Sequence, residues 1–293
     1  MTTRKGIVLA GGSGSRLFPV TNAISKQMIP IYDKPMIYYP LSTLMLADIR
    51  DIIVISSPRD LSSYQRLLGD GSQFGINIIY IPQPSPEGIA QAFHLSKEHI
   101  QDQPSALILG DNIFYGHDLY HLLSNASKFE YGASVFAYKV SDPSRYGVVD
   151  FDRNNNVKSI QEKPKYPLSN YALTGLYFYD SDAYNYAVSL KPSARGELEI
   201  TDLNNLYLKE NKLRVEVMRR GITWLDTGTP QSLLEASNFI ATVQRRQGLV
   251  ISCLEEIAYR KRWITLNEME DSIQSIPNCE YKAYILDFLA EQI

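Results

Sequence analysis

Four short apolar runs recur along the first half of the chain, each separated from the next by a segment long enough for a helix. They cover residues 7–10, 52–55, 76–81 and 106–109. Continuous runs of β-branched and aliphatic residues are typical of strands buried on both faces. Their alternation with helix-length segments predicts an α/β fold: a Rossmann-like, mainly parallel central sheet flanked by helices. In such folds the strand ends share one edge, where ligands bind.

The pattern changes after Gly132, where predicted strands follow one another more closely. We expect strands over 133–140 and 171–179, and a hairpin in which 147–151 and 157–161 flank a polar turn. The other expected elements are helices over 183–190 and 201–211, a strand over 213–218, a helix from Pro230 through 244, and two or three short amphipathic helices over 254–293. No linker, repeat or low-complexity tract interrupts the sequence, so we expect the last segment to pack on the rest.

The segment after the first apolar run is rich in glycine and ends in a cation. It reads Gly11-Gly12-Ser13-Gly14-Ser15-Arg16. Glycines let the backbone turn sharply and bring bare amide groups to a ligand, and a guanidinium offers a fixed fork of donors to phosphate oxygens. Lys26 adds a second positive charge. This combination predicts a site for a nucleoside triphosphate.

Two commoner phosphate loops are excluded by inspection. A P-loop needs a lysine directly after its last glycine, and the dinucleotide fingerprint counted from Gly12 needs a glycine where this chain has Leu17. The glycines alone are equally compatible with a strand-to-helix turn that binds nothing. Arg16, Pro19 and Lys26 favour the phosphate-binding interpretation.

Two aspartates each follow a predicted strand. Asp111 comes after the run 106–109, and Asp226 follows Trp224 and Leu225. Mg²⁺ is typically held by one or two protein carboxylates together with substrate phosphates. Either aspartate taken singly is more typical of a turn or a helix cap. At the edge that carries the glycine loop, the two together predict a magnesium site.

Three further segments carry polar side chains suited to a substrate. Lys163 can hold an anion and Glu162 can hydrogen-bond sugar hydroxyls, although a solvated pair at a strand end is the simpler interpretation. Gln83 can both donate and accept, and so can read the Watson–Crick edge of a pyrimidine, with Gly88 allowing close approach of the backbone. Arg195 precedes the acidic segment 196–202. The residues of this segment are equally typical of the start of a helix.

Composition narrows the possible functions. The chain has 293 residues, 44% of them hydrophobic and 21% charged, and a net charge of −3. These values are ordinary for a soluble globular protein and argue against a broad basic surface for nucleic acid or for an anionic membrane. We find neither a signal-peptide core nor an apolar run of membrane-spanning length. Cys253 and Cys279 and the four histidines show no metal-ligand or redox spacing, so we expect free thiols and a cytoplasmic protein.

Taken together, the motifs resemble those of the sugar-phosphate nucleotidylyltransferases, and most closely the glucose-1-phosphate thymidylyltransferases. The resemblance extends over nearly the whole chain. It is carried by residues 9–17, Ser25-Lys26-Gln27, residues 32–41, Gln83-Pro84-Ser85-Pro86, Gly110-Asp111-Asn112, residues 145–149, Glu162-Lys163-Pro164, and residues 196–202 and 224–229. Uridylyl- and cytidylyltransferases share the glycine loop and the lysine, but they look less like this chain over 32–41 and 83–86.

The resemblance implies the reaction dTTP + α-D-glucose 1-phosphate → dTDP-glucose + pyrophosphate, which supplies deoxysugar synthesis of the dTDP-rhamnose type. The sugar phosphate attacks the α-phosphorus in line. The implied organisation is a nucleotidyltransferase domain over residues 1–245, with a nucleotide-binding part over 1–130 and a hairpin-containing sugar-binding part over 131–230, followed by a C-terminal helical extension over 246–293. Mg²⁺ is the implied cofactor, held by Asp111 and Asp226.

Carried over residue by residue, the resemblance implies that Arg16 and the loop amides hold the leaving pyrophosphate and that Lys26 lies near the transferred phosphate. Lys163, with Arg195 as a second candidate, steadies the sugar phosphate. The implied nucleotide-binding residues are Leu9, Gly11, Gly12, Ser13, Gly14, Ser15, Arg16, Lys26, Gln27, Gln83, Gly88 and Asp111. The implied sugar-phosphate residues are Asn112, Tyr146, Gly147, Glu162, Lys163, Gly175, Arg195 and Trp224, although Trp224 also suits a core position.

The resemblance also implies a homotetramer that a downstream deoxysugar nucleotide inhibits. The second site would involve Tyr115, Gly116, His117, Glu256 and Arg260, which a solvated loop and an ordinary subunit contact explain equally well. Two rival functions are the same chemistry with UTP or another hexose 1-phosphate, and a non-catalytic sugar-nucleotide sensor. A sensor could lose Arg16, Lys26, Asp111 or Asp226 without losing its fold. All four are present in this chain, which argues against the sensor.

Overall fold

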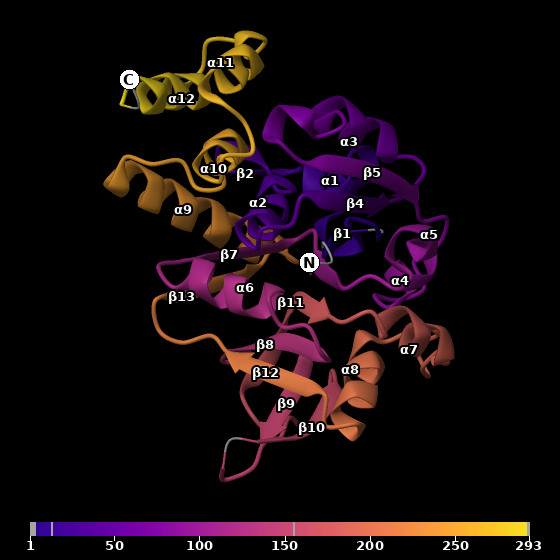
Figure 1. Cartoon of the computed structure of the whole chain (residues 1–293). Coiled ribbons are helices and arrows are strands. Elements are labelled where there is room, and N and C mark those ends of the chain that lie inside the picture. The colour runs from indigo at the N-terminus through magenta and orange to yellow at the C-terminus, as the bar shows by residue number, and fades with distance from the viewer. Residues whose placement is uncertain (1–3, 13, 155, 292–293) are drawn as a thin grey trace.

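The computed structural model describes residues 4–12, 14–154 and 156–291, and its largest element is a nine-stranded mixed sheet (Figure 1). The strand order is β10-β9-β11-β6-β1-β4-β5, with β8 paired to β11 and β12 paired to β8. The strands are β1 (Lys5–Leu9), β4 (Asp51–Ser56), β5 (Asn77–Pro82), β6 (Ser105–Leu109), β8 (Ala133–Lys139), β9 (Gly147–Phe151), β10 (Val157–Glu162), β11 (Tyr171–Tyr179) and β12 (Leu213–Val217). Strands β6, β1, β4 and β5 are parallel, and β11 pairs antiparallel with β6, β8 and β9. The predicted α/β fold and the predicted β9–β10 hairpin are confirmed.

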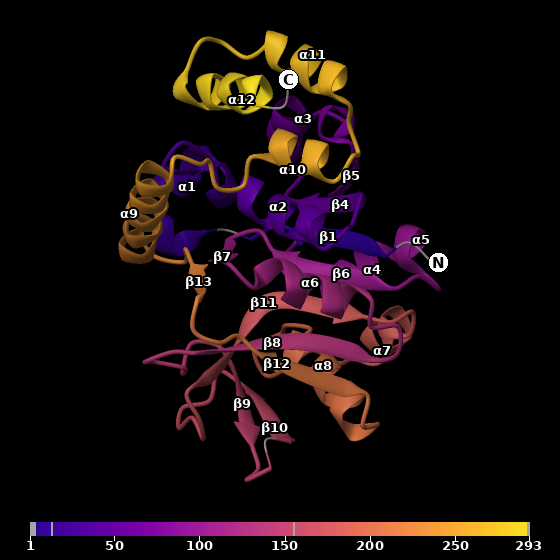
Figure 2. The same ribbon diagram turned by 60° about the vertical axis from the view of Figure 1, so that its left-hand side comes forward.

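Helices cover both faces of this sheet (Figures 1 and 2). They are α1 (Val20–Ala23), α2 (Tyr38–Leu46), α3 (Leu61–Leu68), α4 (Gln91–Leu95), α5 (Lys97–Ile100), α6 (Leu119–Ser127), α7 (Ala183–Ser189), α8 (Ile200–Lys209), α9 (Pro230–Gln247), α10 (Leu254–Arg260), α11 (Leu266–Gln274) and α12 (Glu280–Ala290). Val8 and Val54, which are register partners, face the cluster built with α2, α3, α6 and α10. Their neighbours Ile7 and Ile53 face the cluster built with α4, α7 and α8. Because successive residues of a strand point to opposite faces, a strand covered on both sides needs apolar residues at every position.

A two-stranded sheet lies beyond the carboxyl end of β6. It consists of β7 (Asn112–Gly116) and β13 (Ile222–Asp226), which run antiparallel with Asp226 opposite Asn112. The sequence pattern predicts that Asp226 ends a strand, which is correct, but this strand lies outside the main sheet. Directly opposed residues of an antiparallel pair have Cα atoms about 4.5–5.5 Å apart, so the pairing brings Asp226 next to the neighbour of Asp111.

The C-terminal segment forms three helices that pack on the sheet domain. The helix α9 begins at Pro230 as predicted, and Thr229 and Ser232 form a reciprocal capping box at its start. Leu254 of α10, together with apolar residues of α11 and α12, is buried in the same cluster as α2. The predicted packing of this segment is therefore confirmed. The boundary at 245/246 falls inside α9, and the division into domains stays a prediction.

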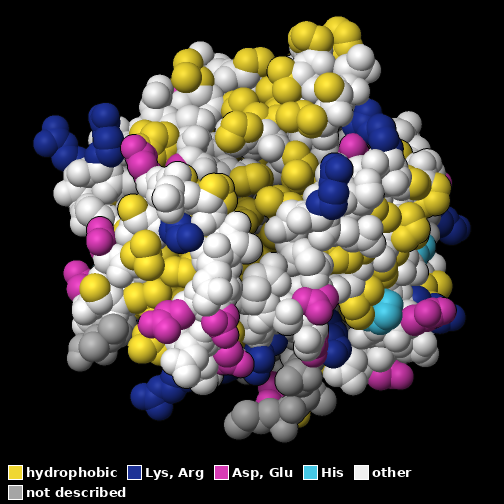
Figure 3. All heavy atoms as spheres, turned by 90° about the horizontal axis from the view of Figure 1, so that it is seen from above, with side chains coloured by type: hydrophobic (Ala, Val, Ile, Leu, Met, Phe, Trp, Pro, Cys, Tyr) yellow, Lys and Arg dark blue, Asp and Glu magenta, His cyan; other side chains and the backbone are white. Residues whose placement is uncertain are grey.

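The surface on the side of the C-terminal helices is partly apolar. Hydrophobic side chains gather there in a broad patch, and most of the charged side chains lie toward its rim (Figure 3). Contiguous apolar patches are typical of surfaces that contact other proteins. Over the described ranges, no helix is long and apolar enough to cross a membrane.

Candidate active site

The loop after β1 passes over the edge of the sheet in a conformation that favours glycine. Gly12 and Gly14 have φ values of 101° and 57°. A side chain on Gly14 would come within 2.7 Å of Thr21 Cγ2, so close packing requires glycine there as well. Ser13, a predicted nucleotide contact, lies outside the described residues. The loop continues into a short 3-10 turn, Ser15–Leu17, which carries Arg16.

This loop borders a cavity of about 280 Å³, which we call the glycine-loop chamber. It is lined by Gly11, Gly12, Gly14, Ser15, Arg16, Leu17, Lys26, Gln27, Asp111, Asp226 and Gly228. The two cations predicted to bind the triphosphate, Arg16 and Lys26, therefore face the same space as the two predicted metal carboxylates.

A second cavity of about 230 Å³ adjoins the first, and we call it the β11 chamber because β11 forms one wall. It is lined by Arg16, Ile89, Leu109, Asp111, Asn112, Arg145, Tyr146, Gly147, Glu162, Lys163, Leu173, Gly175, Tyr177, Ile200, Thr201, Trp224 and Asp226. Seven of the eight predicted sugar-phosphate residues are in this set. Arg16, Asp111 and Asp226 line both chambers, so the two spaces meet at these three side chains.

Asp111 is fixed by two donors. Lys26 Nζ lies 2.5 Å from Asp111 Oδ2, and Asn112 Nδ2 donates to Asp111 Oδ1 over 2.9 Å. The Lys26 side chain is only 11% exposed, so its ammonium group is held against the carboxylate by the surrounding protein. An ion pair this poorly solvated is stronger than one on an open surface.

Asp226 is more buried than Asp111, and the two carboxylates are close enough to interact electrostatically. Burial, followed by the negative charge of Asp111, raises the pKa of Asp226. The Tyr146 hydroxyl donates to Asp226 Oδ2 over 3.3 Å, and Arg145 Nη2 lies 3.7 Å from the same oxygen. Burial and the nearby Asp226 carboxylate raise the pKa of Tyr146 to about 12, so the phenol keeps its proton at neutral pH.

The two carboxylates fit a divalent cation of the magnesium type. Their repulsion is relieved by a positive charge between them, and hard cations prefer oxygen donors. The part of the chain that the structure describes holds no group of three or more histidine, cysteine or acidic side chains able to bind a metal. The protein would thus contribute Asp111 and Asp226, leaving other positions for substrate oxygens and water.

The far end of the β11 chamber is built around Glu162, the last residue of β10. The Thr201 hydroxyl donates to Glu162 Oε2, and Lys163 Nζ lies 3.4 Å from Glu162 Oε1. Lys163 has a φ of 40°, a left-handed conformation that costs a non-glycine residue about 1–2 kcal/mol. Strained backbone of this kind is concentrated at functional sites.

Trp224 lines the β11 chamber and also belongs to the hydrophobic core, the two positions that its sequence context allowed. Its indole is 7% exposed and lies edge-to-face against Tyr146, with ring centroids 5.2 Å apart. Its Nε1 donates to Asn112 Oδ1 over 2.6 Å, and the Gly175 amide donates to the same oxygen over 3.0 Å. Asn112 thus ties the segments of Trp224 and Gly175 to the residue that precedes it, Asp111.

Four predicted contact residues lie outside the two linings: Leu9, Gln83, Gly88 and Arg195. The Gln83 amide is buried and donates to Gln91 Oε1 over 2.7 Å, and a side chain on Gly11 would collide with it. Gly88 has a φ of 106° and packs against the backbone of Leu198, which would collide with a side chain at this position. The packing of the protein itself therefore already requires glycine at 88.

Arg195 is occupied by acidic side chains. Its Nη2 lies 2.8 Å from Glu199 Oε2, 3.1 Å from Glu197 Oε2 and 3.4 Å from Glu162 Oε1. This network raises the pKa of Arg195, chiefly through the hydrogen bond to Glu199. Arg195 would have to exchange one of these partners in order to bind a phosphate.

Sequence reasoning assigned no role to three polar residues of the β11 chamber: Arg145, Tyr177 and Thr201. Tyr177 could have been found, because it lies two residues after Gly175 on the same strand and so shares its face. Arg145 directly precedes a predicted contact, Tyr146. The approach of Thr201 to Glu162 has no local sequence signal, since 39 positions separate them.

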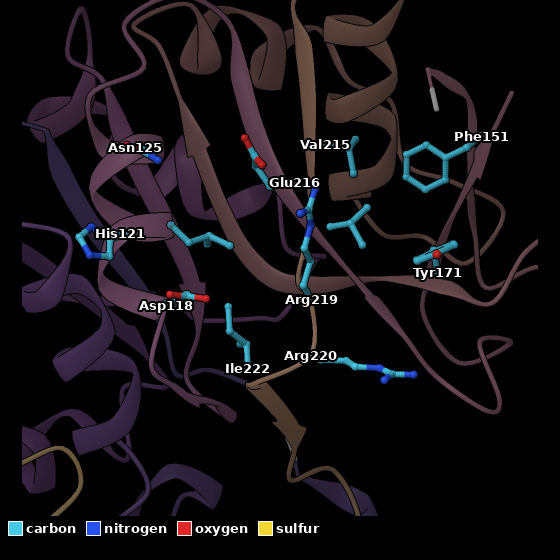
Figure 4. A pocket seen from close by; sticks show the side chains of 12 residues that line it. Asp118, His121, Asn125, Phe151, Tyr171, Val215, Glu216, Arg219, Arg220 and Ile222 are labelled. Carbon is cyan, nitrogen blue, oxygen red and sulfur yellow. The ribbon is translucent and has the colours of Figure 1, made fainter. Parts of the chain in front are cut away.

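The predicted regulatory residues lie on two separate parts of the chain. The Tyr115 hydroxyl donates to Gln247 Oε1 over 2.8 Å, and Gly116 pairs with Ile222. Arg260 Nε donates to Glu256 Oε1 over 2.6 Å within α10. His117 is exposed, next to the larger cavity shown in Figure 4, which has a volume of about 740 Å³. This cavity is lined by Asp118, His121, Leu122, Asn125, Phe151, Tyr171, Val215, Glu216, Val217, Arg219, Arg220 and Ile222.

Comparison with known proteins decides the family. The model of the nucleotidyl transferase family matches residues 5–243. The chain belongs to this family. This nucleotidyl transferase is 56% identical over 285 residues to a glucose-1-phosphate thymidylyltransferase of Xanthomonas campestris pv. campestris (strain B100), with 97% of each chain covered. It is 51% identical to a protein of the same name from Mycobacterium tuberculosis, covering 97% of this chain and 99% of that one.

Solved structures show the same relationship. One from Bacillus anthracis, named for glucose-1-phosphate thymidylyltransferase and solved with a sucrose, is 41% identical with a TM-score of 0.75 and covers 81% of this chain and 95% of its own. A UDP-glucose pyrophosphorylase complexed with UDP-glucose is 25% identical with a TM-score of 0.71, covering 82% of this chain and 99% of its own. The nucleotidyl transferase therefore shares its fold with enzymes that differ in the named nucleotide.

Proposed function

We propose that this nucleotidyl transferase transfers a thymidylyl group from dTTP to α-D-glucose 1-phosphate, giving dTDP-glucose and pyrophosphate. The observation that carries the proposal is the meeting of the two chambers at Arg16, Asp111 and Asp226. A nucleoside triphosphate in one chamber and a sugar phosphate in the other would bring two anions together at these residues. The names of the relatives support thymidine and glucose as the two substrates.

The residues at this junction suit a transfer in which no covalent enzyme intermediate forms. The sugar phosphate oxygen attacks the α-phosphorus in line, and the protein contributes positioning and charge neutralisation. Arg16 and the amides of the glycine loop hold the leaving pyrophosphate, and Lys26 lies near the transferred phosphate. Lys163, with Arg195 as a second candidate, counters the repulsion between the two substrates.

A bound Mg²⁺ would neutralise charge on the triphosphate, and Asp111 and Asp226 would hold it. Tyr146 keeps its proton and donates to Asp226, which fixes the orientation of that carboxylate. Trp224 packs against Tyr146 and limits the access of water to the junction. The charges that stabilise the reacting phosphates therefore act in a partly desolvated space.

Gln83 lies outside both linings and donates to Gln91, so it would have to exchange this partner in order to read the pyrimidine. Thymine and uracil share a Watson–Crick edge, so hydrogen bonds from one amide do not separate dTTP from UTP. Discrimination must come from the space around one methyl group, which is worth about 1–3 kcal/mol. The same chemistry with UTP or another hexose 1-phosphate is thus the nearest alternative.

Pyrophosphate release from glucose 1-phosphate and Mg²⁺ tests the proposal, with dTTP, UTP, CTP and GTP compared side by side. Preference for dTTP supports the proposed reaction, and preference for UTP keeps the chemistry but overturns the base assignment. No release with any triphosphate from folded protein would instead favour a non-catalytic sugar-nucleotide sensor. Omission of Mg²⁺ is expected to abolish release.

We further expect a cytoplasmic homotetramer under feedback inhibition. The apolar patch of Figure 3 supports self-association. His117 directly precedes Asp118, which lines the large cavity of Figure 4, where Arg219 and Arg220 would suit an anionic inhibitor. Glu256 and Arg260 of α10 would complete this site.

A further inference from the structure

Each carboxylate proposed to hold the divalent cation already has a cationic side chain beside it. Lys26 Nζ lies 2.5 Å from Asp111 Oδ2, and Arg145 Nη2 lies 3.7 Å from Asp226 Oδ2. A divalent cation that binds between the aspartates is repelled by both of these charges. Lengthening of at least one of the two pairs would relieve this repulsion.

The structure distinguishes the two side chains by how firmly each is held. The Lys26 side chain is 11% exposed and makes a short hydrogen-bonded ion pair. The Arg145 side chain is 41% exposed, and its 3.7 Å contact is too long for a hydrogen bond. Arg145 also lies in the irregular segment between β8 and β9, where no ladder fixes the backbone. Of the two, Arg145 moves at the lower cost.

Lys26 and Arg145 both offset the charge of Asp226 while no metal is bound, and Lys26 is at the same time paired with Asp111. Asp226 faces the glycine-loop chamber together with Asp111, and the Tyr146 hydroxyl offers its Oδ2 a hydrogen bond without a charge. Arg145 approaches that same oxygen from the β11 chamber, and its guanidinium carbon lies 5.8 Å from the centroid of the Tyr146 ring. Leaving Asp226 would not take Arg145 away from the site, because Arg145 lines the β11 chamber together with Arg16 and Lys163.

We propose that Arg145 is a placeholder counterion, which neutralises Asp226 in the metal-free protein, gives way to the divalent cation, and then turns to the substrate phosphates in the β11 chamber. Only the last step rests on the proposed function, because exchange of Arg145 for a metal ion requires no nucleotide. One side chain thereby weakens metal binding and strengthens phosphate binding. Removing it should change the two in opposite directions.

Mn²⁺ binding to the nucleotide-free protein tests the exchange, measured by electron paramagnetic resonance of free Mn²⁺. R145Q removes the charge and keeps a polar side chain of similar reach. We expect it to bind Mn²⁺ about fivefold more tightly than the wild type, because the metal ion no longer has to break an ion pair between two unit charges 3.7 Å apart in a water-like medium. R145K, which keeps the charge, should stay near the wild type. Unchanged or weaker Mn²⁺ binding by R145Q overturns the proposal.

R214Q is the matched control. Arg214 pairs with Glu216 on β12, and its side chain is 48% exposed, comparable to Arg145. The substitution changes the net charge by the same amount outside both chambers. R214Q should bind Mn²⁺ with the affinity of the wild type. If R214Q binds Mn²⁺ as much more tightly as R145Q does, the net charge of the protein explains the effect, and the local exchange is refuted.

Pyrophosphate release against Mg²⁺ concentration tests the final step. For R145Q we expect a lower apparent KM for Mg²⁺ together with a kcat about tenfold lower, and R145K should recover part of the kcat. A lower KM with unchanged kcat refutes the turn of Arg145 toward the phosphates. If the wild-type protein releases no pyrophosphate from any triphosphate, the proposed function fails, while the Mn²⁺ titrations still decide the exchange.

Discussion

Asn112 connects the fold to the proposed metal site, and its removal should show in both stability and turnover. Its side chain is 2% exposed. The Oδ1 atom accepts from the Gly175 amide over 3.0 Å and from Trp224 Nε1 over 2.6 Å, and Nδ2 donates to Asp111 Oδ1 over 2.9 Å. Asn112→Ala therefore leaves two buried donors without this acceptor and removes one of the two donors that fix Asp111.

An unsatisfied buried donor costs about 1–3 kcal/mol, so the two together predict a loss of about 3 kcal/mol. For a chain of this size the corresponding fall in Tm is about 6–12 °C. Asn112→Asp keeps the acceptors for Gly175 and Trp224 but places a second negative charge beside Asp111. We expect Asn112→Asp to lose at least as much turnover as Asn112→Ala, with a smaller fall in Tm.

Scanning calorimetry and pyrophosphate release, run on the same preparations, separate the two effects. Asn205→Ala is the control, because the half-buried Asn205 makes one hydrogen bond, to the Ile160 carbonyl over 3.2 Å, away from the chambers. Its Tm should fall by less than about 4 °C, as expected for the loss of one ordinary hydrogen bond. A Tm for Asn112→Ala equal to that of Asn205→Ala would refute the hydrogen-bond argument.

Three further predictions follow from buried or closely packed groups. Asp226→Asn relieves repulsion with the neighbouring carboxylate, so Tm should hold or rise while turnover falls by about 100-fold or more; an unchanged rate at limiting Mg²⁺ excludes Asp226 as a ligand. Gly11→Ala collides with the Gln83 amide and should raise the KM for dTTP about tenfold with little change in kcat, whereas a fall in kcat alone contradicts this role of Gln83. Burial raises the pKa of Glu255. An acid with a raised native pKa loses stability as pH rises from its ordinary pKa to the raised one. Glu255→Gln can still accept a hydrogen bond from the Tyr281 hydroxyl, and its Tm should depend less on pH between pH 4 and 8 than that of the wild type. A plot of Tm against pH that runs parallel to that of the wild type would contradict this.

Much of the fold was predictable because its signals are local. The four apolar runs identified β1, β4, β5 and β6, since strands covered on both faces must be apolar throughout. Pro230 marked the start of α9 because its fixed φ suits the first turn of a helix. The glycine loop was recognisable because turning over a strand end requires conformations that few other residues adopt.

The candidate site was predictable as a set of residues and much less so as a set of contacts. The resemblance offered Arg195 as a second candidate for the sugar phosphate, and the structure adds that three glutamates surround it. It assigned Gly88 to a close approach of the backbone to a base, which stays a prediction, and the structure adds that the backbone of Leu198 leaves no room for a side chain at this position. The contacts of Arg195 with Glu162 and of Gly88 with Leu198 could not be predicted, because these partners lie on distant segments that only packing brings together. Glu197 and Glu199, by contrast, are local neighbours of Arg195.

The sequence by itself determined which segments become strands and helices, and which side chains could bind phosphate or metal. It did so through backbone geometry and periodic burial, which act over a few residues. Only the tertiary structure decided that Asp226 reaches Asp111, through the antiparallel pairing of β7 with β13. Only there does Tyr146, 80 positions away, meet Asp226, and Arg145 with it. Contacts of this range form when the whole sheet and its helices are in place, because no local interaction favours them beforehand.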